Sequence, residues 1–251
     1  MTSILLIIST LVFSEAKTLL TKIPVPLEAP AVTQAPEQIR LTFTLDATAS
    51  TMGIYWTTSN KTTDDYVATV QYGLTESSMT QGVTGSNDNY TAFNIKSPSI
   101  HFATMTGLKP STFYWYKVGS PVYGWSINLN FTTRPVDGDA SRYPITWIAY
   151  GDMGISNSQA TADLTAKKIQ SGEASFITHA GDISYADNRA GINNGSIYEG
   201  VLNDFYNEVQ PSSAYGAYMT SSGYVYTLCP SRSYITLKRG YIILKRSYGF
   251  S

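Results

Sequence analysis

Two aspartates occupy matching positions, each directly after a glycine that closes a short apolar segment. Asp152 comes two positions after Ile145–Tyr150. Asp182 comes two positions after Ser175–Ala180. Two carboxylates facing one site repel each other unless they are protonated or bridged by cations, and hard divalent or ferric ions prefer such oxygen ligands. The pattern therefore predicts a metal site, although a strand-end aspartate can also serve as a helix cap or turn former.

A strand–helix–strand–helix order is expected around these aspartates. The periodicity of Ser158–Gln170 predicts a helix with Ala162, Ala166 and Ile169 on one face, and Gly172 is placed to end it. Two strands joined by such a helix lie parallel in one sheet, so their carboxyl ends open at the same edge. Both aspartates should therefore lie together at that edge.

A second helix is expected after the second aspartate. Its apolar residues recur at helical spacing: Tyr198, Leu202, Phe205 and Val209. Ser196 and Glu199 are spaced as a capping box, and Pro211 is expected to stop the helix.

The first half of the chain has a different pattern, made of short β-type segments separated by turn residues. The predicted strands are Gln38–Asp46, Thr51–Ser59, Tyr66–Gly73, Tyr90–Ile95, Ser99–Thr106, Thr112–Gly119 and Trp125–Thr133. Within the second, Met52, Ile54 and Trp56 share one face. Leu108–Tyr114 fits a tyrosine corner. Residues 37–134 are therefore predicted to form an antiparallel β-sandwich, fibronectin type III-like, with its aromatic residues in the core.

Composition narrows the function classes. The chain has 251 residues and a formal net charge of -1, which gives no reason to expect nucleic acid as a partner. Its single cysteine, Cys229, excludes an intrachain disulfide and a cysteine-based metal site. The two histidines, His101 and His179, are expected to be structural.

The N-terminus predicts a protein of the secretory pathway or the extracellular space. Ile4–Phe13 is apolar and shorter than the roughly 20 residues needed to cross a bilayer, and small residues follow it. Residues 1–16 are expected to be a signal peptide, with a buried first strand as the alternative, and residues 17–36 an extended leader. Four Asn-x-Ser/Thr sequences are expected glycosylation acceptors: Asn60, Asn89, Asn130 and Asn194.

Gly151–Gly154 and Gly181–Asp187 resemble the first two metal-binding motifs of the purple acid phosphatases, which belong to the calcineurin-like metallophosphoesterase superfamily. The resemblance extends from Pro36 to about Thr220. It implies a partial metallophosphoesterase domain over residues 145–220 and phosphate monoesters as substrates. No transmembrane span is expected in this chain.

The same resemblance implies roles for individual residues. Asp152 would bind Fe(III), Asp182 would bridge Fe(III) and a divalent ion (Zn, Mn or Fe), and Tyr185 would bind the iron as a phenolate. A phenol with a pKa near 10 ionises at acid pH only beside a strong Lewis acid. An iron-bound phenolate gives this family its purple charge-transfer band.

The chain departs from the family after the strand expected near Tyr215–Thr220. The Gly-Asn-His-Glu run of the family does not follow, and residues 221–251 contain no His, Asn, Asp or Glu. These residues form a basic tail that we expect to be foreign to the fold. A complete two-metal site is therefore not expected from this chain, none of the family's catalytic histidines is present, and a sheet ending after two strands would leave an unpaired edge.

The sequence thus predicts phosphate monoester hydrolysis of the purple acid phosphatase type, with this chain incomplete and inactive. The alternative is a non-catalytic secreted product in which the β-sandwich acts as a binding module. A nucleotide-binding domain is disfavoured, because Gly151–Gly154 matches neither of the usual glycine-rich phosphate loops.

Overall fold

The computed structural model describes residues 35–58, 65–92, 95–142, 144–186, 195–221 and 242–245. The predicted signal peptide, nearly all of the leader, two of the glycosylation acceptors (Asn60 and Asn194) and Cys229 lie outside these residues. So does most of the basic tail. No helix in the described ranges is long and apolar enough to cross a membrane.

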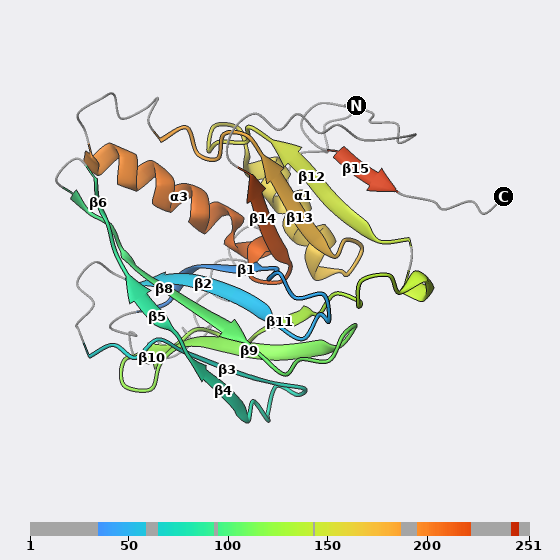
Figure 1. The fold of residues 1–251 in the computed structure, drawn as a ribbon. Helices are drawn as coiled ribbons and strands as arrows, with labels where there is room; N and C mark the ends of the chain where they lie inside the picture. The colour runs from blue at the N-terminus through green and yellow to red at the C-terminus, as the bar shows by residue number, and fades with distance from the viewer. Residues whose placement is uncertain are drawn as a thin grey trace, which may run out of the picture. The chain divides into compact units, whose positions relative to one another are not determined.

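Two antiparallel sheets form the N-terminal half (Figure 1). One has the order β1 (Glu37–Thr42), β2 (Met52–Thr58), β8 (Ser99–Met105), β5 (Ser86–Asp88). The other has the order β10 (Gly124–Trp125), β9 (Phe113–Ser120), β3 (Thr69–Gly73), β4 (Gln81–Thr84), with β11 (Leu129–Thr132) also paired to β9. One buried apolar cluster takes side chains from both sheets, so the antiparallel sandwich predicted from the sequence is confirmed.

Several details of the predicted strands were wrong. Strand β1 ends at Thr42 and not at Asp46, and the segment predicted as one strand, Trp125–Thr133, contains two, β10 and β11. Tyr90–Ile95 is not one strand, because β6 (Thr91–Ala92) and β7 (Ile95–Lys96) pair with each other as an antiparallel hairpin. Strands β4 and β5 were not predicted, since both are almost entirely solvent-exposed and lack an apolar face. Strand β3 begins three residues later than expected, at Thr69.

The core of the sandwich follows the predicted alternation only in part. Met52, Ile54 and Trp56 of β2 are buried and Tyr55 is exposed, but Gly53 and Thr57 on the opposite face are buried as well. The tyrosine corner is also confirmed, because the Lys109 backbone N–H donates to the Tyr114 hydroxyl over 3.0 Å.

His101 has a structural role, as predicted. Its ring is fully buried, Nε2 accepts a hydrogen bond from the Thr58 hydroxyl at 2.8 Å, and Nδ1 donates to Asn87 Oδ1 at 2.8 Å. Burial lowers the pKa of His101 to about 4, so the ring stays neutral at ordinary pH. Both ring nitrogens are used within the sandwich, so His101 is no metal ligand.

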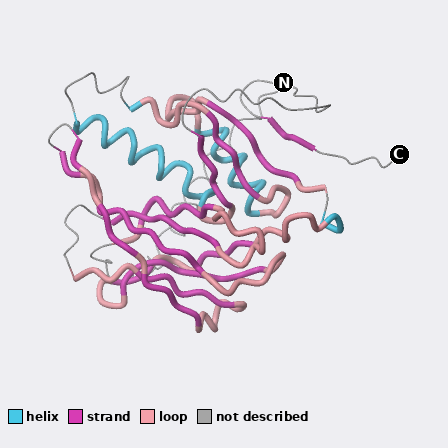
Figure 2. Tube along the Cα trace, viewed as in Figure 1, coloured by secondary structure: helices cyan, strands magenta, loops and turns pink. Residues whose placement is uncertain are grey.

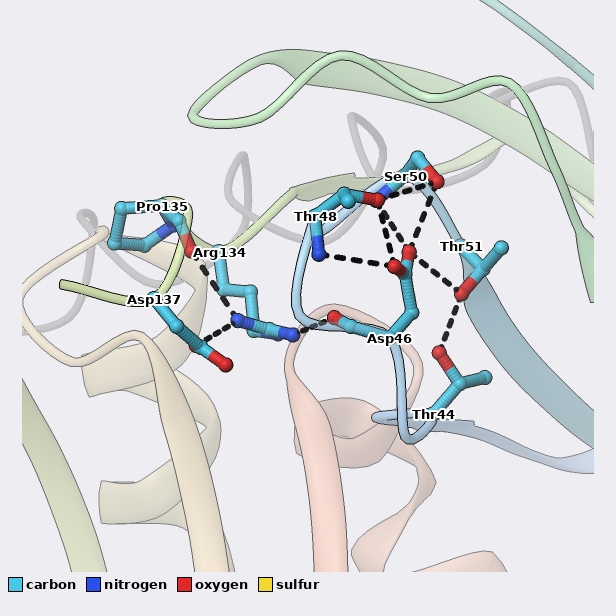
Figure 3. A network of polar contacts seen from close by, with 8 residues as sticks. All are labelled: Thr44, Asp46, Thr48, Ser50, Thr51, Arg134, Pro135 and Asp137. Carbon is cyan, nitrogen blue, oxygen red and sulfur yellow. Dashed lines mark hydrogen bonds and ion pairs between the residues drawn. The ribbon is translucent and has the colours of Figure 1, made fainter. Parts of the chain in front are cut away.

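A hydrogen-bonded carboxylate organises the loop between β1 and β2 (Figure 3). Asp46 accepts hydrogen bonds from the backbone N–H and hydroxyl groups of Thr48 and Ser50, at 2.6–2.9 Å, and from the Thr51 hydroxyl at 3.1 Å. Arg134, two residues after the end of β11 (Leu129–Thr132), donates to the Asp46 carbonyl. The hydroxyl of Thr48 and the other donors hold the pKa of Asp46 well below its usual range.

Asp46→Asn is expected to reduce stability at neutral pH and to have progressively less effect in acid. The lowered pKa of Asp46 means that its contribution is complete above the unfolded-state pKa of about 4 and is lost as the pH falls toward the folded-state value. Thermal unfolding of both proteins from pH 7 to about pH 2.5 measures this difference. Asp204→Asn, which changes an exposed residue of helix α3 (Gly195–Ser213), is the control. A constant difference between wild type and Asp46→Asn across this range would contradict the expectation.

A mixed sheet with two helices follows the sandwich along the chain (Figure 2). Along the chain its elements are β12 (Thr146–Gly151), α1 (Gln159–Gln170), β13 (Phe176–Ala180), α3 (Gly195–Ser213), β14 (Ala217–Ser221) and β15 (Ile242–Lys245). The strand order is β14-β13-β12-β15, in which β12, β13 and β14 are parallel and β15 is antiparallel to β12. The predicted parallel pair is confirmed. The expectation that the sheet ends after these two strands was wrong, because β14 and β15 flank the pair. Strand β15 belongs to the tail that we expected to be foreign to the fold.

The helix ends agree with the predictions only in part. Gly172 has φ +73° and its N–H donates to the Ile169 carbonyl at 3.0 Å, so α1 ends as expected. Ser196 is not the N-cap that the capping box requires, because α3 already begins at Gly195. Pro211 does not stop α3, which runs to Ser213. Pro211 lies in the last turn of this helix, two residues before its end.

The sandwich and the mixed sheet are joined through β1 and α3. Ile39 of β1 donates its N–H to Gln210 Oε1 at 3.0 Å, and its carbonyl accepts from the Ser213 hydroxyl at 2.9 Å. Farther into the sandwich, the buried Tyr116 hydroxyl donates to the Ala214 carbonyl at 2.5 Å. These contacts lie within one unit, Val32–Ser251.

Candidate metal site

The register of β12 and β13 brings the two motif loops together. Gly151 pairs with Ala180 at the carboxyl ends of the parallel strands. The Asp152 N–H donates to the Ala180 carbonyl at 3.2 Å, and the Asp182 N–H donates to Asp152 Oδ1 at 2.9 Å. The two aspartates therefore lie in contact at one sheet edge, as the sequence predicted, and both are solvent-exposed.

The backbone at this edge adopts conformations that side chains rarely allow. Asp152 has φ 49° and Tyr185 has φ 55°. The left-handed region costs a residue with a side chain about 1–2 kcal/mol, and a bulky aromatic residue is uncommon there. Such strain is concentrated at functional sites in proteins. Both residues are ligands in the resemblance-based prediction.

The glycines of the two motifs leave room for these side chains. A Cβ atom on Gly181 would lie 2.4 Å from Asp152 Oδ1, and one on Gly154 would lie 3.0 Å from Cδ2 of Tyr185. Both glycines also have positive φ, 81° and 59°. A further hydrogen bond, from the Gly154 N–H to the Ile183 carbonyl at 2.9 Å, joins the two loops.

Tyr185 completes a set of three oxygen donors. Burial, followed by the charges of Asp152 and Asp182 and hydrogen bonds with them, raises the pKa of Tyr185. The phenol therefore lies beside both carboxylates. A multivalent cation at the same place would invert this effect and favour the phenolate.

His179 supports the loop from beneath. It is buried, its Nε2 donates to the Asp182 carbonyl at 3.1 Å, and its Nδ1 accepts from the Tyr218 hydroxyl at 2.5 Å. Burial lowers the pKa of His179, although the Asp182 carbonyl and the charge of Asp152 oppose this. The predicted structural role is confirmed. The bond to Tyr218, on β14, was not predicted, because nothing in the local sequence pairs residues so far apart.

The chemistry of the donor set matches a hard cation, since two carboxylates and a phenol offer only oxygen. The described part of the chain contains no group of three or more His, Cys, Asp or Glu side chains that could hold a metal ion. Both histidines of the chain are engaged within the protein. Asp152, Asp182 and Tyr185 therefore fit part of the coordination of one metal ion. They do not complete a site for two metal ions.

The predicted glycosylation acceptors differ in exposure. Asn89 is exposed next to β5, whereas Asn130 is half-buried within β11. The other two lie outside the described residues.

Comparison with protein families gives a match that covers the sandwich. Residues 36–133 match the family described as the purple acid phosphatase N-terminal domain. The match ends before the motif loops.

Curated relatives extend the similarity in part. Purple acid phosphatase 21 of Arabidopsis thaliana is 30% identical over 50% of this chain and 26% of its own length. Purple acid phosphatase 5 of the same plant is 27% identical over 77% of this chain and 46% of its own length. Fe(3+)-Zn(2+) purple acid phosphatase 12 is 29% identical over 47% of this chain and 24% of its own length. The chain thus spans less than half the length of each of these relatives.

Solved structures show only weak similarity. The sensor domain of the anti-sigma factor RsgI4 of Pseudobacteroides cellulosolvens covers 40% of this chain with a TM-score of 0.26 and 19% identity. A fibronectin type III domain of a human protein covers 43% with a TM-score of 0.22 and 19% identity.

Proposed function

We propose that the α/β part of this chain carries the first half of a phosphatase metal site, because the residues before it, 36–133, match the family described as the purple acid phosphatase N-terminal domain. The reaction is hydrolysis of phosphate monoesters at acid pH by the complete site. The observation that carries this proposal is the contact between the Asp152 and Asp182 loops, with Tyr185 beside both carboxylates.

Each of the three residues has a distinct role in this proposal. Asp152 would hold Fe(III), Asp182 would be shared with a divalent ion, and Tyr185 would bind the iron as a phenolate. A relative named as an Fe(3+)-Zn(2+) enzyme supports this metal pair. The bound ions would supply Lewis-acid stabilisation of the phosphoryl oxygens and activation of water. His179 keeps the Asp182 backbone in place through its 3.1 Å hydrogen bond.

We propose further that these 251 residues do not form the complete two-metal site and are inactive alone. The chain has only two histidines, and both donate and accept within the fold. No histidine remains to bind the second ion or to protonate a leaving alkoxide. The β-sandwich as a non-catalytic secreted binding module is the alternative, and no contact among the described residues favours it.

Secretion is part of the proposal. It is supported by the signal-like sequence of residues 1–16 and by the exposure of Asn89, one of four glycosylation acceptors.

The test combines metal analysis with a phosphatase assay at acid pH on residues 17–251, purified after secretion and incubated with excess Fe(III) and Zn(II). We expect fewer than two metal ions per chain and no turnover above that of Asp182→Asn. Two ions per chain with turnover abolished by Asp182→Asn would show that the chain completes the site. A folded protein that binds neither ion would favour the non-catalytic alternative.

A further inference from the structure

A polar pocket lies between β1, β2, α3 and β14 and is lined in part by Tyr218, whose hydroxyl bonds to the His179 ring that supports the motif loop. Its volume is about 330 Å³, within the size range of small-ligand sites. The lining residues are Arg40, Leu41, Thr42, Tyr55, Tyr206, Tyr218, Met219 and Thr220. The pocket therefore has one cationic residue and three phenols, and no acidic residue in its wall.

Within the part of the chain that the structure describes, Arg40 is a cation without an anionic partner. One of its N–H groups donates to the Gln38 carbonyl at 3.0 Å, and its guanidinium carbon lies 3.8 Å from the centre of the Tyr206 ring. No carboxylate of the described chain pairs with it. A guanidinium has five N–H donors, so most of those of Arg40 are free of protein acceptors. Desolvating such a charge without a partner is costly, which favours a counter-ion from solution.

The electrostatic surroundings of Arg40 likewise do not compensate its positive charge. Burial lowers the pKa of Arg40, and the nearby phenols of Tyr206, Tyr218 and Tyr55 only partly oppose this. The hydroxyls of Tyr55 and Tyr206 make no hydrogen bond within the described residues, so both can act as donors. A bound anion would supply both the missing charge and acceptors for these groups.

We propose that this pocket binds a small oxyanion through Arg40, with the phenols of Tyr55 and Tyr206 as additional donors. Inorganic phosphate is the probe that fits this chemistry, because the planar guanidinium fork matches two phosphate oxygens. Binding here does not depend on the metal site or on the proposed hydrolysis.

The pocket is nevertheless connected to the motif loop. Tyr218 lines it and donates to His179 Nδ1 at 2.5 Å, and His179 in turn donates to the Asp182 carbonyl at 3.1 Å. An anion beside Tyr218 would thus lie two hydrogen bonds from the backbone of Asp182. Phosphate at the metal edge and phosphate in the pocket must therefore be distinguished by variants at each place.

The test is equilibrium dialysis of radiolabelled phosphate against the EDTA-treated chain at low ionic strength, with thermal unfolding of each variant as a check of the fold. We expect one site per chain, binding at least tenfold weaker in Arg40→Gln, and binding unchanged in Asp182→Asn. Arg40→Lys keeps the charge and loses the fork, so it should be weaker than wild type. Tyr55→Phe removes one exposed hydroxyl from the wall and should weaken binding without affecting the fold.

Three results would overturn the proposal. Wild-type affinity in both Arg40→Lys and Tyr55→Phe would exclude the pocket even if Arg40→Gln failed to fold. Loss of binding in Asp182→Asn would place phosphate at the metal edge. Absence of any phosphate binding or thermal stabilisation by phosphate in the wild-type chain would show that the pocket has no oxyanion ligand.

Discussion

Trp56→Ala is expected to lower the free energy of unfolding by about 3–5 kcal/mol, the cost of removing a large aromatic side chain from a packed core. Trp56 is fully buried in β2, and its indole N–H lies 3.4 Å from the Tyr66 hydroxyl. It also faces His101 across β2 and β8, with the ring centres 5.3 Å apart. Chemical denaturation followed by circular dichroism measures this loss.

Trp125→Ala is the matched control, because it removes the same side chain from a half-exposed position. Trp125 lies at the edge strand β10 beneath the Lys117 ammonium, 4.8 Å from the ring centre. Losing that contact is expected to cost only about 0.5–1 kcal/mol. Equal effects of the two substitutions would mean that the sandwich core is not the main source of stability.

Asp182→Asn is expected to weaken Fe(III) binding by more than the roughly 10–100-fold that follows loss of an outer-shell partner. The substitution replaces a charged oxygen ligand by a neutral amide at the point where the two loops meet. Its backbone N–H, which donates to Asp152 Oδ1, remains, so the loops themselves should hold. Titration of the metal-free chain with Fe(III), using a competing chelator, measures the change.

The control for this titration is Asp204→Asn, which removes one carboxylate from an exposed site on α3. It should bind Fe(III) as the wild type does. Equal affinity of wild type, Asp204→Asn and Asp182→Asn would show that iron binds elsewhere or nonspecifically.

Most of the sandwich could be predicted because its strands alternate between buried and exposed positions. Strand β8 shows this best, because buried and half-buried residues alternate along it from Ser99 to Met105. Strands β4 and β5 could not be predicted, since nearly every residue in them faces solvent and the backbone pairing alone defines them. The pairing of β15 with β12 likewise depends on segments roughly 100 residues apart along the chain, a long-range choice that local patterns do not encode.

The candidate metal site was largely predictable, because parallel strands open at one edge and both aspartates follow their strands at the same distance. The sequence did not reveal how the loops are supported. Tyr218 reaches His179 only after β14 pairs with β13, and Arg40 meets Tyr206 only after β1 packs on α3. Such contacts arise from tertiary packing of distant segments, so neither the loop support nor the Arg40 pocket has a local signature.

The most direct test of the proposed site is the visible absorption of the chain on addition of Fe(III). If Asp152, Asp182 and Tyr185 form one ligand set, iron should produce a phenolate charge-transfer band. The band should vanish in Tyr185→Phe and persist in Tyr55→Phe, which removes a phenol of the Arg40 pocket instead. A band of equal intensity in wild type and Tyr185→Phe, or no band at saturating iron, would contradict the assignment of Tyr185 as an iron ligand.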